Sequence, residues 1–312
     1  MFNQYRLKEV LAEYKQNFVS KQWGEEKYKW EAVKWFQDNW DVKAPDFAEM
    51  LSRSLDRTFN LLASVNNFPK GMIVGFAKAA PEDVRAMFID LFDESKDVFE
   101  RMNAFKLQSS ILLERHGNGA AQHYQYENAI STYLWLRYPD KYYIYKFGEV
   151  KTVASELESD YKFKKGAYAD NVRSFLRFYD EISEALKQDT ELVNLFQSQL
   201  TETCYPDPEL KTLTIDVGFY ISRMFSQNKQ DNNSDDEDAL DGSDPSLFSA
   251  EWFPSLEEYT PGFTKEKWLE LLNVNFPILR TNYLINCLSR HNRRGNEMRH
   301  GCGISLPLAV IS

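Results

Sequence analysis

The sequence contains an aspartate followed by a glutamate-x-lysine triplet, the residue types that a metal-dependent nuclease uses. Asp140 precedes Glu149 and Lys151. In such an enzyme the carboxylates hold Mg²⁺, and the metal activates the water that attacks the phosphodiester. This chemistry requires the glutamate and the lysine to lie on one strand and to point the same way. Residues 150–157, however, have apolar side chains at helical spacing, and an acidic residue is favoured at a helix N-terminus. We therefore interpret Glu149 as the start of a helix rather than as a metal ligand.

A second set of the same residue types is more compressed. Asp207, Glu209 and Lys211 fall within one proline-containing turn, which leaves no room for the hairpin that the nuclease arrangement needs. The sequence also lacks the GxxxxGK[ST], GxGxxG, GxSxG and HExxH motifs. No CxxC pair occurs among the three cysteines, which are Cys204, Cys287 and Cys302. We expect no catalytic residue, no metal site and no cofactor in this chain.

Basic and aromatic side chains could instead contact nucleic acid, because arginine and lysine bind phosphates and exposed rings stack on bases. The candidate phosphate contacts are Arg53, Arg57, Lys141, Lys146, Lys162, Lys164 and Lys165. The candidate stacking residues belong to the densest aromatic cluster and are Trp23, Trp30 and Trp35. Each group also has a simpler interpretation. The two arginines, one helical turn apart, are typical of a solvated helix face, and clustered tryptophans are typical of a core.

The net charge does not exclude a nucleic-acid partner. The 312 residues carry a formal net charge of −10. Residues 227–244 hold seven acidic residues and one lysine, a net −6, so the remainder carries −4. A local basic surface is therefore compatible with the acidic total.

The hydrophobic pattern predicts a mainly α-helical protein. Apolar residues recur at helical spacing through most of residues 1–226, which we interpret as one multi-helix recognition-type domain. Residues 46–62 are predicted as a single helix, with one buried face formed by Phe47, Met50, Leu51, Leu55, Phe59 and Leu62. The exception is the Tyr-rich run at 141–147, which predicts a small β element with a partner strand near residues 66–74.

The later residues divide into three parts. Residues 227–247 are predicted as an acidic, disordered linker, because they cannot bury enough apolar surface to fold. Residues 248–276 begin a small helical module, and residues 277–312 form an irregular basic and apolar tail whose change of character suggests a frameshift. The N-terminus is an amphipathic helix rather than a signal peptide, and no apolar run approaches the ~20 residues that span a bilayer. We expect a cytoplasmic protein without membrane contact.

Six segments together resemble the N-terminal region of McrB-type AAA+ proteins. They are YKWEAVKWFQDNW (28–40), FAEMLSRSLDRTFNLLAS (47–64), DVRAMFIDLFDES (83–95), AISTYLWLRYPDKYYIYKF (129–147), CYPDPELKTLTIDVGFYISR (204–223) and EEYTPGFTKEKWLELLN (257–273). The resemblance extends from Tyr5 to about Phe276. It implies a modification-dependent restriction system, which is a defence system. In that family the N-terminal region recognises DNA that often carries a modified cytosine, a GTP-hydrolysing AAA+ ring follows, and an McrC-type subunit supplies the nuclease.

The chain departs from this family because the AAA+ part is absent from its 312 residues. We therefore expect a truncated remnant that acts as a non-catalytic DNA-recognition region, with an AAA+ motor fragment and an McrC-type nuclease as partners. Two alternatives remain. One is a PD-(D/E)xK-type nuclease that uses Asp140, Glu149 and Lys151. The other is a structural adaptor without DNA binding.

Overall fold

The computed structural model describes residues 1–63 and 67–225, and this part of the chain is mainly α-helical, as predicted. The chain divides into two compact units, Met1–Ser243 and Asp244–Ser312, and all described residues belong to the first. Twelve α-helices are described: α1 (Gln4–Asn17), α2 (Trp23–Glu26), α3 (Tyr28–Asn39), α4 (Phe47–Ser54), α5 (Pro69–Ala79), α6 (Pro81–Leu91), α7 (Val98–His116), α8 (Glu127–Arg137), α9 (Phe147–Glu156), α10 (Tyr168–Gln188), α11 (Thr190–Gln199) and α12 (Lys211–Tyr220). Three shorter helical turns join them: η1 (Phe18–Gln22) and η3 (Ile221–Phe225), which are π-helical, and η2 (Asp56–Leu61), which is a 3₁₀-helix.

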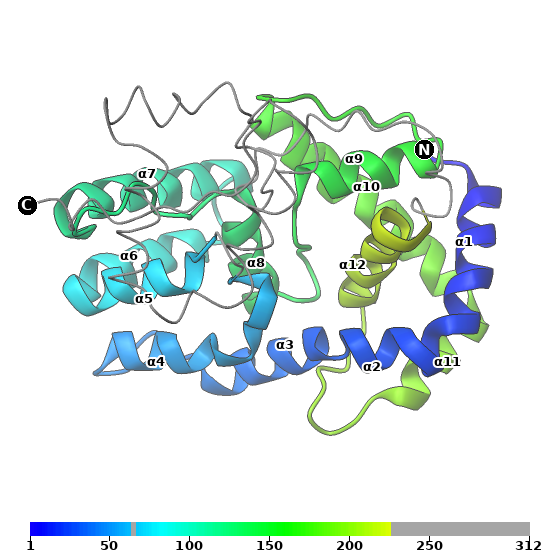
Figure 1. The fold of residues 1–312 in the computed structure, drawn as a ribbon, viewed down its shortest axis with the longest axis horizontal. Coiled ribbons are helices and arrows are strands. Elements are labelled where there is room, and N and C mark those ends of the chain that lie inside the picture. Colours follow the sequence, from blue (N-terminus) through cyan, green and yellow to red (C-terminus); the bar gives the residue numbers. More distant parts are fainter. Residues whose placement is uncertain (64–66, 226–312) are drawn as a thin grey trace, which may run out of the picture. The chain divides into compact units, whose positions relative to one another are not determined.

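The helices from α3 to α8 form a first group in which successive helices are neighbours and α8 returns to α3. Figure 1 shows α4, α5, α6 and α7 stacked together at one side. The centre of this group is Phe88, whose ring contacts those of Phe105 and Tyr133. Pro69 and Pro81 each occupy the first position of a helix, where no backbone N–H is needed for a helical hydrogen bond.

The second group places α12 among α1, α9 and α10, with α11 beside α1 and α10. All ten residues of α12 are buried, including its polar side chains. A helix that is covered on every face needs apolar or paired side chains all round, which the sequence LTIDVGFY supplies. α12 is therefore the central helix of this group.

Gly218 on α12 fits against the hydroxyl of Tyr179 on α10. A Cβ atom at position 218 would lie 2.5 Å from Tyr179 Oη, and the Tyr179 side chain is itself buried. We expect Gly218→Ala to lower the free energy of unfolding by about 1–3 kcal/mol through overpacking, measured by urea denaturation. Adding Tyr179→Phe removes the clashing hydroxyl and should recover part of the loss. A single variant as stable as the wild type would contradict this packing.

The predicted β element near 141–147 is wrong. Residues 142–146 carry no regular secondary structure, and residue 147 already belongs to α9. The region expected to supply a partner strand forms α5 instead, and no strand occurs in residues 1–63 or 67–225. The Tyr-rich run is buried between helices, and the backbone N–H of Tyr145 donates to Ser131 Oγ on α8 at 2.9 Å. A side chain thus accepts the hydrogen bond of a backbone N–H group that would pair with a neighbouring strand in a sheet.

The predicted linker at 227–247, the module at 248–276 and the tail at 277–312 lie outside the described residues. Within residues 1–63 and 67–225, no helix is long and apolar enough to cross a bilayer.

Candidate nucleic-acid interface

The structure brings two of the predicted arginines to one of the predicted tryptophans. Trp35 on α3 is partly exposed, and its indole N–H donates to the carbonyl oxygen of Arg53 at 2.7 Å. The guanidinium of Arg57, in η2, lies 5.2 Å from the centroid of the Trp35 ring. Both arginine side chains are exposed. The hydrogen bond fixes the plane of the indole, and the guanidinium is attracted to its face. The result is a rigid ring with positive charge above it.

Phe59 is exposed next to this pair, although the sequence predicts it in the core. α4 ends at Ser54, and Phe59 has φ 41° and ψ −124° within η2, so the predicted helical period breaks there. A bulky residue in the left-handed region is strained, and surrounding contacts must hold it. Those contacts come from the buried residues Thr58, whose hydroxyl donates to the Leu55 carbonyl, and Leu61. The Phe59 ring is left 54% exposed.

Tyr28 completes the surface from the first position of α3. Its ring meets Phe59 edge to face, with centroids 6.0 Å apart. Tyr28 and Trp35 are seven residues apart on α3, about two turns or ~10 Å along its axis, so they share one face. We name the set Tyr28, Trp35, Arg53, Arg57 and Phe59 the α3–η2 surface.

Two acidic residues near the α3–η2 surface have cationic partners. Asp56 accepts from Lys70 at 2.8 Å, and Glu31 lies 3.6 Å from Lys27. These pairs reduce the negative potential that would oppose phosphate binding, while Arg53 and Arg57 add positive charge. Arg53 and Arg57 thus place exposed positive charge on this surface in a chain whose total charge is acidic.

A buried ionic centre lies behind the N-terminal end of α3. Lys29 Nζ is 2.5 Å from Asp216 Oδ1 and 2.9 Å from Glu26 Oε2. The other carboxylate oxygen of Asp216 accepts from Tyr14 at 2.6 Å and from Gln22 at 3.0 Å. Burial alone would lower the pKa of Lys29, but the charges of Asp216 and Glu26 outweigh it and raise the pKa. Lys29 thus remains charged inside the protein and joins α3 to α12.

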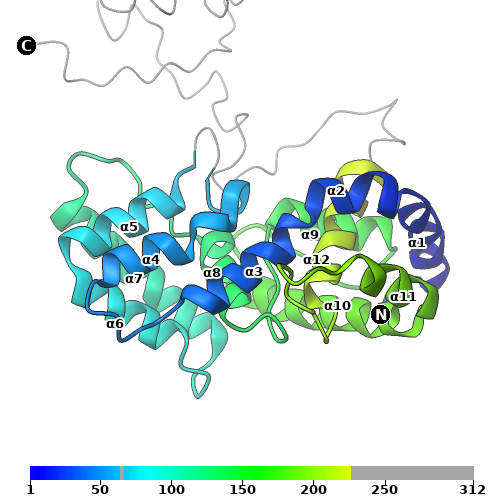
Figure 2. The same ribbon diagram turned by 90° about the horizontal axis from the view of Figure 1, so that it is seen from below.

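Three cations surround the ring of Phe219 on α12. Lys29, Lys146 and Arg223 lie 4.2, 4.4 and 4.7 Å from its centroid. Arg223 is exposed, and it is close enough to Tyr28 to influence its pKa, which burial raises to about 12. Figure 2 shows η3, at the end of the yellow helix α12, on the same side of α2 and α3 as η2. Arg223 therefore adds exposed positive charge at Phe219 on α12, and this charge acts on Tyr28.

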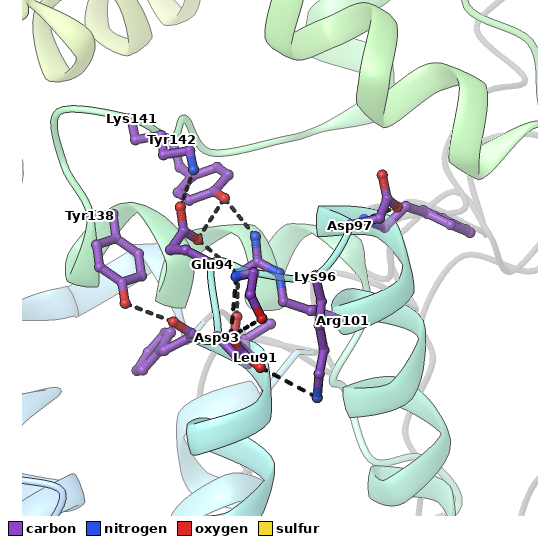
Figure 3. A network of polar contacts seen from close by, with 12 residues as sticks. Leu91, Asp93, Glu94, Lys96, Asp97, Arg101, Tyr138, Lys141 and Tyr142 are labelled. Carbon is purple, nitrogen blue, oxygen red and sulfur yellow. Dashed lines mark hydrogen bonds and ion pairs between the residues drawn. The ribbon is translucent and has the colours of Figure 1, made fainter.

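Lys141, on the connection between α8 and α9, belongs to a different network, which includes Glu94 on the connection between α6 and α7 (Figure 3). Its ammonium group pairs with Glu94, whose other carboxylate oxygen accepts from Tyr142 at 2.8 Å. Arg101 Nη2 donates to the Tyr142 hydroxyl at 2.7 Å, and the Arg101 side chain is 2% exposed. The charge of Lys141 is thus balanced by Glu94, which weakens it as a phosphate contact.

Lys162, Lys164 and Lys165 are exposed on the connection between α9 and α10. The side chain of Asn171 holds the backbone of Lys164, accepting from its N–H at 3.0 Å and donating to its carbonyl at 2.7 Å. In Figure 1 this connection is far from α3. The three lysines therefore form a second basic segment rather than a continuation of the α3–η2 surface.

Two of the three candidate stacking residues are in the core. Trp23 is 8% exposed and Trp30 is fully buried, with their ring centroids 5.0 Å apart. Trp30 also donates its indole N–H to Asp207 at 3.2 Å. Neither ring has a free face for a base, so the predicted stacking role is wrong for Trp23 and Trp30. Trp35 alone of the three is partly exposed, with the Arg57 guanidinium over its ring.

The nuclease-like residues do not form a common site. Glu149 lies in the first turn of the helix α9, as predicted, and Asp140 accepts from the Tyr205 hydroxyl at 2.8 Å. The strand that the PD-(D/E)xK arrangement requires is therefore not formed at Glu149 and Lys151. No group of three His, Cys, Asp or Glu side chains within residues 1–63 and 67–225 is placed to hold a metal ion.

The second set of nuclease-like residues has structural partners. Asp207 accepts from the backbone N–H groups of Thr212 at 3.1 Å and Leu213 at 2.8 Å at the start of α12. Burial raises the pKa of Asp207 to about 6, although these N–H groups oppose the shift. The other two residues of the set form ion pairs with residues outside it: Lys211 pairs with Asp180, and Glu209 pairs with Lys187.

Comparison with known proteins gives no match: no family model, no curated protein and no solved structure is similar to the chain.

Proposed function

We propose that the chain is a non-catalytic DNA-recognition module that contacts DNA through the α3–η2 surface. The observation that carries this proposal is the Arg57 guanidinium over the partly exposed ring of Trp35, beside the exposed Phe59. Cations contact phosphates and rings contact bases, so one surface offers both kinds of contact that recognition needs.

The DNA phosphates are expected to supply most of the affinity. Arg53, Arg57 and Arg223 are exposed, and each can approach a phosphate. Cations that neutralise phosphates release bound counterions, so affinity falls as salt rises. With ~3 phosphate contacts, a fourfold rise in salt weakens duplex binding about 40-fold.

The biological setting that we propose rests on the resemblance to McrB-type proteins. It places the module in a cytoplasmic restriction system, with a modified cytosine as the recognised feature. An AAA+ motor fragment and an McrC-type nuclease would then be the protein partners. The residues of the α3–η2 surface support the proposal of DNA contact, and the proposal of a modified cytosine rests on the resemblance alone.

Binding titrations test the proposal directly. Fluorescently labelled duplexes that differ only in cytosine methylation are titrated with the protein at about 50 and 200 mM salt. We expect binding at the lower salt that weakens steeply at the higher, with tighter binding to the methylated duplex. Equal binding to both duplexes would retain DNA as the partner but remove the modified base. No binding at low salt would contradict the proposal and favour the adaptor interpretation.

A further inference from the structure

We infer that the α3–η2 surface takes an unpaired base, so that the module prefers single-stranded to double-stranded nucleic acid. This inference rests on the proposed function and specifies the form of nucleic acid that the same surface binds. It depends on the exposure of Phe59, the placement of Trp35 and the distribution of positive charge around the two rings.

Phe59 has an exposed aromatic ring on which the paired bases of a duplex cannot stack. In a double helix both faces of an internal base are covered by its neighbours, so a protein ring stacks only on a base that is unpaired or unstacked. The ring of Phe59 is 54% exposed, and its edge-to-face contact with Tyr28 leaves it free of a stacked partner ring. An unstacked base can stack on such a face.

The backbone holds the Phe59 ring outward. Thr58 and Leu61, on either side of it, are buried, while the left-handed φ of Phe59 directs its own side chain away from the core that the apolar period predicts. Strained residues of this kind cluster at binding sites, where the surrounding structure maintains them. The outward ring is therefore a fixed feature of η2.

A second ring and the flanking cations match an extended strand. Trp35 lies on the same face of α3 as Tyr28, about 10 Å along the helix axis, and its indole plane is fixed by the hydrogen bond to Arg53. Arg57, in η2, lies 5.2 Å from the centroid of the Trp35 ring, and the charge of Arg223 acts on the Tyr28 hydroxyl by lowering its pKa. Rings that accept bases, with cations beside them that follow the backbone, are the usual design of single-strand binding surfaces.

The experiment compares one sequence in single-stranded and duplex form. Labelled single-stranded DNA, the same sequence as RNA, and the DNA duplex are titrated by fluorescence anisotropy. We expect single strands to bind more tightly than the duplex. Phe59→Leu, which removes the ring but keeps an apolar side chain, should weaken single-strand binding about 5- to 100-fold. Comparing the DNA and RNA strands shows whether the sugar contributes.

Phe68→Leu is the matched control, because Phe68 is 47% exposed and meets Tyr124 edge to face at 6.1 Å. It should leave single-strand binding unchanged. Phe59→Tyr keeps a ring at the same backbone position and should retain affinity, which separates loss of stacking from loss of folding. Duplex binding equal to or tighter than single-strand binding, or a Phe59→Leu variant with wild-type affinity, would overturn the inference while leaving DNA recognition intact. No binding to any of the three nucleic acids would instead contradict the proposed function itself.

Discussion

Replacing Lys29 with methionine is expected to lower the free energy of unfolding by about 3–5 kcal/mol, because it leaves the buried carboxylate of Asp216 without its cation. Lys29 and Asp216 are each 1% exposed, and their charged atoms are 2.5 Å apart. Breaking a buried pair from one side costs far more than the pair itself contributes, since the remaining charge cannot reach water. Urea denaturation of the purified protein measures the loss.

Lys34→Met is the matched control on the same helix. Lys34 pairs with Asp38 at 2.6 Å, but both side chains are exposed, so its loss should change stability by no more than about 0.5 kcal/mol. The pKa of Lys29 is raised, so its contribution is fully present below the unfolded lysine pKa of ~10.4 and is lost only as pH rises through the raised value. The contribution of Lys29 to the stability of the wild type should therefore stay constant across neutral pH. A Lys29→Met variant as stable as Lys34→Met would show that the buried centre is not formed.

Arg101→Met is the second substitution with a large expected effect, about 1–3 kcal/mol of lost stability, because buried hydrogen-bond acceptors lose their donor. Arg101 is buried, donates to the Leu91 carbonyl at 2.5 Å, and lies 2.9 Å from Glu94. Figure 3 shows how these contacts and the Tyr142 hydroxyl tie the end of α6 to α7 and to the Tyr-rich connection. Without the guanidinium, the Leu91 carbonyl and the Tyr142 hydroxyl lose a donor, while Glu94 keeps its ion pair with Lys141.

Arg173→Met provides the comparison for Arg101. Its guanidinium is 3.0 Å from Asp97, and both side chains are substantially exposed, so the expected loss is at most about 1 kcal/mol. Both variants are measured in the same denaturation assay. Similar losses for the two arginines would argue against a buried network around Arg101.

Amphipathic helices were the part of the fold that the sequence could predict. The period of apolar residues predicts helices through most of residues 1–226 and a helical stretch at 150–157, and the structure has α9 at Phe147–Glu156. Such a period reports directly on which face of a helix is buried. The prediction of a strand at 141–147 was wrong because a composition rich in tyrosine indicates that a segment is buried, not that it is paired with another strand. A strand also needs a hydrogen-bonding partner, and the region that was expected to supply one forms α5.

Less of the candidate site than of the fold could be predicted from the sequence, and Phe59 is an example. Its spacing from Leu55 and Leu62 continues the buried period, and no glycine marks the left-handed position that turns the ring outward. Lys29 and Asp216 illustrate a second limit, because 187 residues separate them and no local spacing links them. Arg53, Arg57 and Trp35 were named as candidates in separate groups, and the contacts that join Trp35 to the arginines appear only in the structure.

The most direct test of the α3–η2 surface is the salt dependence of duplex binding by two multiple variants. The first carries Arg53→Ala and Arg57→Ala; it keeps the Arg53 carbonyl that accepts from Trp35, and it leaves the buried centre intact. The second carries Lys162→Ala, Lys164→Ala and Lys165→Ala. The account predicts that the arginine variant binds more weakly and loses about 1.8 from the slope of log affinity against log salt, while the lysine variant keeps the wild-type slope. A lysine variant with the reduced slope, beside an arginine variant that binds as the wild type does, would contradict the account and place the DNA on the connection between α9 and α10.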